Sequence, residues 1–449
     1  MVPADVMKTL QRFMLVDGFD LVIDFEHSAG SRIVDARSGR SYLDMFTMFA
    51  SHPLGMNHPR LTEPEFVSRI GRAAVNKPSN SDIYTVEMAE FVDVFGRVAA
   101  PGWMRHLFLV SGGALAVENA LKVAFDWKVR KNEAAGRGAG LGGQVVHFRQ
   151  AFHGRSGYTM SLTNTDPTKT LNFPKFTWPR IDNPVVTFPC SGDRLDAVVA
   201  AEERAVDQIE QVVSEHGHDI AALIVEPIQG EGGDNHFRGE FLKTLRRLCD
   251  THEIFFILDE VQTGLGMTGR WWAHQHVDVE PVAHAFGQKT QVCGIAVGGR
   301  VDEVADHCFA MSSRINSTWG GNLTDMVRAT RFIEIISDEH LVDNAASAGA
   351  HGLARLEAFQ ADHPEEITNA RGRGLFLAFD LVRPEIRPAL LARAFDDGLI
   401  VLGSGERSVR LRPALNVTPG ELDEAAERLD RALAATLDGD AVSKVGAPA

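Results

Sequence analysis

The sequence predicts an α/β fold in which a mostly parallel central sheet lies between helices, together with a smaller α+β domain. Apolar runs at residues 221–225 and 254–258 are uniformly hydrophobic, and each leads directly into an acidic residue, which is typical of buried parallel strands. Segments in which apolar residues recur at helical spacing alternate with such runs. From about Asp325 the chain changes to shorter strands and helices, which indicates the second domain.

Composition and charge limit the partners that this chain of 449 residues can bind. Its formal net charge of −15 disfavours nucleic acid and anionic membranes, since both require a basic surface. No apolar run is long enough to span a membrane, and the first residues lack the basic and apolar regions of a secretory signal. The four cysteines form no C-x-x-C pair, which argues against a zinc ribbon. We expect a cytoplasmic protein with reduced thiols and no metal site.

The first hundred residues predict short, peripheral elements. Short strands are expected at residues 21–26 and 41–46, with turn residues between them. A polar loop with a proline, residues 76–82, leads into a helix whose apolar residues recur at helical spacing as far as Phe95.

A strand, a tight turn and a helix follow at residues 107–122. The turn, residues 111–114, contains two glycines, which allow the backbone to approach a ligand closely. The free amides at the start of a helix attract anions, so the turn can hold a phosphate group. A glycine-rich turn on its own is more often a plain connection. In the company of the motifs below, we assign Gly113 and Ala114 to a phosphate site.

The loop after the next expected strand, residues 144–148, carries an aromatic and a cationic side chain. Phe152 could stack on a flat ring, and Arg155 could hold a carboxylate through two hydrogen bonds. Taken singly, Phe152 would more often be a core residue. His153 would more often be a hydrogen-bonded loop residue than a base.

Acidic residues follow two of the buried strands, at Glu226 and Asp259, and Glu231 lies in the glycine-rich loop after the first of these strands. An apolar strand ending in Asp-Glu also resembles the Walker B strand of a nucleotide hydrolase, but no G-x-x-x-x-G-K-[ST] motif occurs in the chain. Ligands bind at the carboxyl ends of such strands, so Asp259 should share a crevice with the pair Gln288 and Lys289.

An acid at the end of one strand and a lysine at the end of another suit pyridoxal phosphate chemistry. The acid keeps the pyridine nitrogen protonated, which makes the ring an electron sink, and the lysine forms a Schiff base and moves the proton. Residues 76–80, 152–157 and 289–294 resemble the class III pyridoxal-phosphate aminotransferases, most closely their lysine 6-aminotransferase branch. The resemblance covers residues 15–437 and implies a fold-type I homodimer with bound pyridoxal 5′-phosphate.

The resemblance also implies an activity and a set of site residues. The enzyme would move the ε-amino group of L-lysine to 2-oxoglutarate, giving glutamate and the 6-semialdehyde, which cyclises to piperideine-6-carboxylate. The implied cofactor-binding residues are Gly113, Ala114, Phe152, Glu226, Asp259, Val261, Gln262 and Thr318, of which Thr318 would reach the phosphate in the partner subunit's site. The implied substrate-binding residues are Arg155 for the lysine α-carboxylate, Glu231 as a movable partner for an arginine, and Arg410, or Arg412 as the near alternative, for 2-oxoglutarate.

The same resemblance divides the chain into parts. Residues 1–60 would join the small domain, residues 61–324 would form the large cofactor-binding domain, and residues 325–438 the carboxy-terminal small domain. A final helix over residues 419–437 has Thr418 as its N-cap, and residues 439–449 would form a mobile tail.

One position departs from the family. The Schiff-base lysine directly follows the glycine of the stretch at residues 285–294, and here that position is Gln288. Lys289 is a possible substitute, but a one-residue shift on an extended backbone turns a side chain to the opposite face. We therefore expect an inactive or very slow aminotransferase, whether Gln288 is an engineered change or a natural loss. The alternatives are an ornithine or 4-aminobutyrate type of class III enzyme, and a natural pyridoxal-phosphate-binding homologue without transaminase activity.

Overall fold

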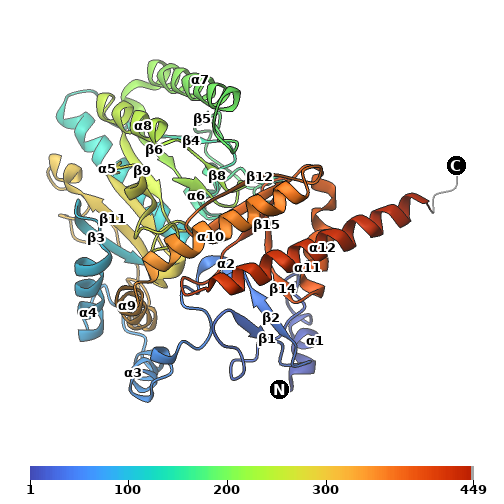
Figure 1. The fold of residues 1–449 in the computed structure, drawn as a ribbon. Helices are drawn as coiled ribbons and strands as arrows, with labels where there is room; N and C mark the ends of the chain where they lie inside the picture. The colour runs from blue at the N-terminus through green and yellow to red at the C-terminus, as the bar shows by residue number, and fades with distance from the viewer. Residues whose placement is uncertain (446–449) are drawn as a thin grey trace.

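A seven-stranded sheet forms the centre of the computed structural model, which describes residues 1–445 (Figure 1). In spatial order its strands are β3 (Met104–Val110), β11 (Cys293–Gly298), β10 (Ala283–Phe286), β9 (Phe255–Asp259), β6 (Ile220–Val225), β4 (Gln144–Phe148) and β5 (Arg180–Ile181). All neighbours are parallel except at β11, which runs antiparallel to β10 and β3. The mostly parallel sheet predicted from the sequence is confirmed, and every residue of β6 and β9 is buried.

One hydrophobic core lies between the central strands and three helices. These helices are α5 (Gly113–Ala134), α7 (Asp193–His216) and α8 (Gly239–Thr251). The short helix α6 (Gly157–Leu162) follows the loop after β4. In α8 the buried residues Phe241, Leu242, Leu245 and Cys249 recur at helical spacing, so a single apolar side of the helix faces the strands.

A second core joins the sheet to the carboxy-terminal part, and it includes side chains of α3 (Pro64–Val75), α4 (Val86–Val94), α9 (Leu323–Asp338) and α10 (Leu341–Asp362). Phe286, at the end of β10, packs into this core, with its ring centroid 5.1 Å from that of Phe95 and 6.2 Å from that of Trp272. Helix α9 contacts α3, α4 and α10, so it lies between the large domain predicted over residues 61–324 and the small domain predicted over residues 325–438.

The smaller part combines both ends of the chain (Figure 1). One antiparallel sheet contains β12 (Ile367–Arg373), β13 (Phe376–Leu381), β16 (Ser408–Leu411) and β15 (Leu402–Ser404). A second sheet contains β1 (Arg32–Val34), β2 (Ser41–Asp44) and β14 (Leu399–Ile400), so the amino-terminal segment pairs with the carboxy-terminal part. Helices α11 (Arg387–Asp396) and α12 (Pro419–Val445) pack against each other beside these sheets.

Residues 21–26 do not form the strand that the sequence predicts, and only Ile23 makes a single bridge, to Asp35. The Asp24 carboxylate accepts hydrogen bonds from the backbone N–H groups of Glu26 at 2.9 Å and His27 at 3.1 Å. Such local bonds compete with strand pairing and favour a turn.

The final helix begins where the sequence predicts. The Thr418 hydroxyl accepts a hydrogen bond from the N–H of Glu421 at 3.3 Å, and the Glu421 carboxylate accepts one from the N–H of Thr418 at 2.8 Å. The helix continues to Val445, so residues 439–445 are helical, in contrast to the expected tail. Residues 446–449 of that tail lie outside the described residues.

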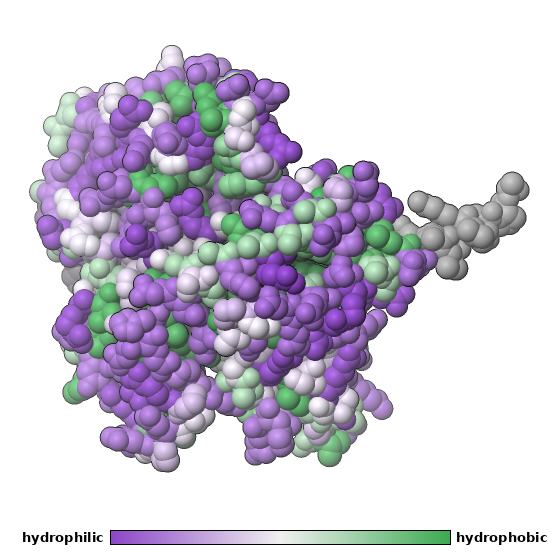
Figure 2. Space-filling view, viewed as in Figure 1, coloured by the Kyte–Doolittle hydropathy of each residue, from purple (hydrophilic) through white to green (hydrophobic). Residues whose placement is uncertain are grey.

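Short elements complete the fold: α1 (Val6–Leu10), α2 (Thr47–Ala50), β7 (Ile228–Gln229) and β8 (Asn235–His236). Helix α2 is a left-handed turn, with φ angles of 42°, 53°, 58° and 62° along its four residues. None of the helices within residues 1–445 is both long and apolar enough to cross a membrane. Figure 2 shows hydrophilic side chains over most of the visible face and hydrophobic ones in scattered patches.

Candidate active site

A cavity of about 280 Å³ lies at the carboxyl ends of the central strands. It brings together most of the site residues predicted from the sequence, although they come from distant segments. The lining residues are Gly113, Ala114, Phe152, His153, Gly154, Arg155, Glu226, Ile228, Asp259, Val261, Gln262, Thr263 and Gln288. Asp259 and Gln288 therefore share a crevice, as expected where parallel strands end at one edge, but Lys289, the other residue of the predicted pair, does not line it.

Asp259, the last residue of β9, is held by two contacts. One carboxylate oxygen lies 2.8 Å from Nδ1 of His153, and the other accepts a hydrogen bond from the N–H of Val261 at 3.1 Å. Burial alone would lower the pKa of His153, but the hydrogen bond to Asp259 and the negative charges of Asp259 and Glu226 raise it. His153 therefore orients and supports the carboxylate that the sequence assigned to a pyridine nitrogen.

Glu226 follows β6 and is fully enclosed beside this pair. Its oxygens accept hydrogen bonds from the backbone N–H groups of Phe152 and Gly230, each at 3.0 Å. Burial raises the pKa of Glu226 to about 7, with His153 opposing the shift and Asp259 adding to it. The carboxyl group can thus be protonated near neutral pH, which limits the negative charge in the cavity.

The turn before α5 also lines the cavity. Gly112 has a φ of 112°, a conformation that glycine adopts at little cost, and the helix begins at Gly113. A Cβ atom on Gly113 would lie 3.0 Å from Cγ1 of Val261, so the backbone and the Val261 side chain are in close contact. The unpaired amides of the first helical turn border the cavity at Gly113 and Ala114, which suits a phosphate.

Gln288 follows β10 and Gly287 and begins a short 3₁₀ turn over Gln288–Thr290. Its φ of 53° lies in the left-handed region. Gln288 lines the cavity, and its amide oxygen is buried without a hydrogen-bond partner. An unpaired buried acceptor is costly and is suited to a ligand that donates a hydrogen bond.

Lys289 does not line this cavity. Its side chain is 1 % exposed, and Nζ donates a hydrogen bond to the backbone oxygen of Gln262 at 2.6 Å. Burial, with some repulsion from Arg412, lowers the pKa of Lys289 to about 7. The one-residue shift thus turns the amine away from the cavity, and its hydrogen bond holds it there.

Glu231 lies in the loop between β7 and β8 and contacts two cations. One of its oxygens pairs with Nζ of Lys169, and the other accepts a hydrogen bond from Nη2 of Arg410 at 2.8 Å. The Lys169 ammonium also lies 5.4 Å from the ring centroid of Phe152. Arg412, the alternative to Arg410, is fully buried against Asp234 and is therefore already neutralised.

Two further predicted residues lie at or beyond the cavity rim. Arg155 is exposed at the cavity and makes no ion pair within residues 1–445, so its guanidinium is free for a carboxylate. Thr318 is exposed and does not line the cavity of its own chain; its backbone oxygen accepts a hydrogen bond from the Ser79 hydroxyl at 2.6 Å.

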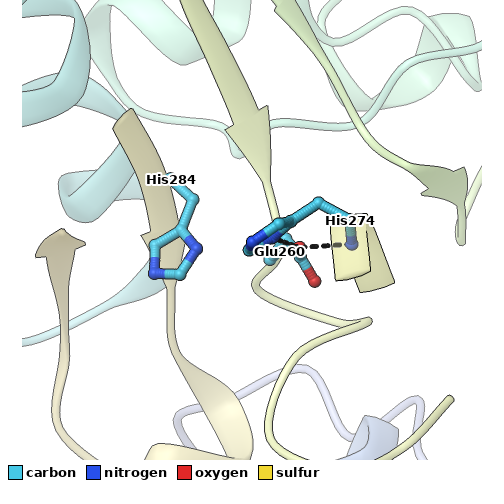
Figure 3. Close-up of side chains that lie close together, drawn as sticks. All are labelled: Glu260, His274 and His284. Carbon is cyan, nitrogen blue, oxygen red and sulfur yellow. Dashed lines mark hydrogen bonds and ion pairs between the residues drawn. The ribbon is translucent and has the colours of Figure 1, made fainter. Parts of the chain in front are cut away.

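A second buried cluster supports the segment that follows Asp259 (Figure 3). The Glu260 carboxylate accepts hydrogen bonds from the backbone N–H groups of Ala273 and His274 and from the Thr263 hydroxyl, and it pairs with the His274 ring at 2.7 Å. Although burial raises the pKa of Glu260, the interactions with His274 hold it at about 2. His284 of β10 completes the cluster, but neither of its ring nitrogens has a hydrogen-bond partner.

Two contacts of the site could not be predicted from the sequence. His153 is the hydrogen-bonded loop residue that the sequence predicts, but nothing in the sequence indicates that its partner is Asp259. Lys169 gave no usable signal, because it lies in a single short 3₁₀ turn, Pro167–Lys169, and meets Glu231 only in the folded chain.

Comparisons with known proteins agree with this geometry. A family model described as aminotransferase class-III matches residues 16–433. The L-lysine-epsilon aminotransferase of Mycobacterium tuberculosis is 53% identical over 432 residues, which cover 96% of each chain. The enzyme of the same description from Amycolatopsis lactamdurans is 51% identical with the same coverage. A solved structure of the lysine aminotransferase from M. tuberculosis in the internal aldimine form superposes with a TM-score of 0.95 at 52% identity, covering 97% of this chain and 100% of that one.

Proposed function

The chain belongs to the class III aminotransferases, and on that basis we propose that it is built to move the ε-amino group of L-lysine to 2-oxoglutarate. The products are glutamate and the 6-semialdehyde, which cyclises to piperideine-6-carboxylate. The observation that carries the proposal is the convergence of Asp259, Glu226, Phe152 and the start of α5 on one cavity, in a chain about half identical to lysine aminotransferases along its whole length.

The cavity residues fit pyridoxal 5′-phosphate. When bound, this cofactor supplies an electron sink that stabilises negative charge on the carbon next to the transferred nitrogen. Asp259, oriented by His153 at 2.8 Å, would keep the pyridine nitrogen protonated. Phe152 and Val261 would enclose the ring, and the amides at Gly113 and Ala114 would bind the phosphate, to which Thr318 of a second copy would add a hydroxyl. This role for Thr318 requires a homodimer.

The charged groups around the cavity would bind two different substrates in turn. Arg155 would hold the α-carboxylate of lysine, so that the ε-amine reaches the cofactor site. While Glu231 neutralises Arg410, the site accepts a substrate with one carboxylate; when Glu231 moves away, Arg410 can bind a carboxylate of 2-oxoglutarate. Lys169 offers Glu231 a second partner during this exchange.

Gln288 would make the present chain inactive or very slow. An amide cannot bond covalently to the cofactor or move a proton at the reacting carbon. Loss of an acid–base group costs about 10²–10⁴-fold in rate, and loss of the covalent exchange adds to that. The amine of Lys289 is held by the Gln262 backbone and does not line the cavity, so it would not compensate.

The test compares the chain with its Gln288→Lys variant. Each protein is incubated with pyridoxal phosphate, reduced with borohydride and mapped by peptide mass, and lysine-dependent glutamate formation is measured in parallel. We expect label on residue 288 and substantial turnover only in Gln288→Lys. A label on Lys289 together with ordinary turnover in the unmodified chain would refute the loss of activity.

The same variant tests the choice of substrate. With Gln288→Lys, L-lysine should be a better amino donor than ornithine or 4-aminobutyrate. A preference for either of those donors would replace the lysine assignment with another class III activity. If the variant binds the cofactor but transfers no amine from any of them, the chain is a cofactor-binding homologue without transaminase activity.

A further inference from the structure

We propose that Gln288 makes the cavity selective for the amine form of the cofactor, pyridoxamine 5′-phosphate, over the aldehyde form. This inference rests on the proposed function, because it assumes that the cavity binds this cofactor. In the family resemblance, position 288 belongs to the residue that bonds to the aldehyde carbon. The group at this position therefore faces the one part of the cofactor that differs between the two forms.

The first argument is hydrogen bonding. The amide oxygen of Gln288 is buried at the cavity wall and has no partner. The protonated amine of pyridoxamine phosphate is a charged donor, and a hydrogen bond from a charged donor is about twice as strong as a neutral one. An aldehyde oxygen can only accept, so it would leave the Gln288 oxygen unpaired or require the weaker, neutral bond from the amide N–H groups.

The second argument is charge. A lysine at position 288 would bring an ammonium close to the cofactor amine and repel it, whereas glutamine is neutral. Among the residues that line the cavity, Arg155 is the only Lys or Arg, while the charge of His153, whose pKa is raised, offsets that of Asp259, and Glu226 can be protonated near neutral pH. The electrostatic advantage for a cationic amine at this position therefore comes from the absence of a lysine ammonium at residue 288.

The third argument is that the aldehyde form cannot make a covalent bond with a lysine in this cavity. Aldehyde binding in an aminotransferase gains from a covalent bond with lysine, and no lysine lines this cavity. The neighbouring Lys289 amine is bonded to the Gln262 backbone oxygen, and Lys169 is paired with Glu231. The aldehyde therefore has no covalent advantage here, and the amine form is not displaced by an internal lysine.

The experiment is calorimetric titration of the cofactor-free protein with pyridoxamine 5′-phosphate and, separately, with pyridoxal 5′-phosphate. We expect the amine form to bind at least about tenfold more tightly.

Gln288→Met keeps the shape but removes the acceptor, and should lose about tenfold in affinity for the amine form only. Gln288→Glu adds a negative charge to the acceptor and should strengthen amine binding; it serves as the test if the methionine variant fails to fold. Gln288→Lys should reverse the preference. Borohydride mapping would identify binding of the aldehyde to surface lysines.

The outcomes separate the inference from the proposed function. Equal affinities, or tighter binding of the aldehyde by the unmodified chain, would overturn the selectivity, and so would amine binding that does not respond to Gln288→Met or Gln288→Glu. In those cases the proposed function still stands if Gln288→Lys binds the aldehyde and turns over lysine. If neither the chain nor Gln288→Lys binds either form, the proposed function fails and the selectivity fails with it.

Discussion

Glu226 couples the stability of the protein to pH, because its folded-state pKa of about 7 lies above the ordinary value of 4.5. Below pH 4.5 both the folded and the unfolded chain bind the proton, so the group contributes no difference. As the pH rises to about 7 the unfolded chain releases the proton first, so the free energy of unfolding falls, and the loss levels off above that pH. The raised pKa of His153 acts in the same direction, since its folded form also retains its proton to higher pH.

Glu226→Gln should therefore flatten the pH dependence. The glutamine is neutral and similar in shape to the protonated glutamate. Between pH 5 and pH 8 the free energy of unfolding of the variant, relative to that of the unmodified chain, should rise by on the order of 2–3 kcal/mol. Urea denaturation of the cofactor-free protein between pH 5 and 8 would measure it. If the unmodified chain becomes more stable over this range, or if both proteins show the same slope, the assignment of Glu226 is wrong.

His284 is a second residue whose environment predicts an effect on stability. Both ring nitrogens are buried without partners, and burial, with repulsion from His274, lowers the pKa of His284 to about 3. Replacing an unsatisfied buried polar group with an apolar one of similar size is neutral or stabilising. We expect His284→Leu to raise the free energy of unfolding by about 1–2 kcal/mol, measured in urea.

The matched control for His284 is His274. Its ring pairs with Glu260 at 2.7 Å and accepts a hydrogen bond from the indole N–H of Trp103 at 3.3 Å. His274→Leu should lower the free energy of unfolding by about 3 kcal/mol or more, since it leaves the buried Glu260 charge with fewer donors. A destabilising effect of the same size in His284→Leu would mean that His284 has a function that its contacts do not reveal.

At the scale of elements, the loop between β7 and β8 meets strand β16 through the pair Glu231 and Arg410. Glu231→Gln should leave Arg410 without its charge partner, and so favour diacids. In a Gln288→Lys background we expect the KM for 2-oxoglutarate to fall severalfold and the KM for lysine to rise. Steady-state kinetics with both substrates would measure this split.

Lys169→Met provides the opposite test of the same loop. Glu231 contacts two cations, Lys169 and Arg410. In Lys169→Met the contact with Arg410 remains, so Glu231 should move away from Arg410 less readily. The KM for 2-oxoglutarate should then rise. If Glu231→Gln and Lys169→Met shift the KM for 2-oxoglutarate in the same direction, movement of Glu231 does not control access to Arg410.

The elements that the sequence predicted well are those with a local cause. Strand β9 is an uninterrupted apolar run that ends in Asp259, and the start of α5 follows two glycines, so composition alone locates both. The bond between His153 and Asp259 and the ion pair between Lys169 and Glu231 join residues 106 and 62 positions apart, and no local pattern indicates them. The left-handed turn of α2 was missed for the same reason: its residues are not glycines, and it depends on tertiary contacts such as the Thr47 hydroxyl donating to the Arg412 backbone oxygen at 2.6 Å.

At the scale of the whole molecule, one chain leaves apolar surface uncovered near Thr318. Ile83, Tyr84 and Val86 are 66 %, 76 % and 69 % exposed at the start of α4, and Trp319 is 41 % exposed. Tyr84 also lines a groove with Phe108. Exposed side chains of this kind mark an interaction surface, and a second copy of the chain would cover them while bringing its Thr318 to the first copy's cavity.

A hybrid dimer tests this arrangement. Asp259→Asn and Thr318→Ala should each weaken cofactor binding in a uniform dimer, because every site then lacks one of the two groups. When the variants are co-expressed with different tags and the hybrid is purified through both, one of its two sites combines an intact Asp259 with an intact Thr318, and the other lacks both. About half of the sites should therefore regain tight binding in a fluorescence titration with pyridoxamine phosphate.

A doubly tagged Asp259→Asn dimer is the control and should regain none. No recovery in the hybrid would place Thr318 outside the partner's site, and tight binding by the uniform Thr318→Ala dimer would remove Thr318 from the cofactor site altogether.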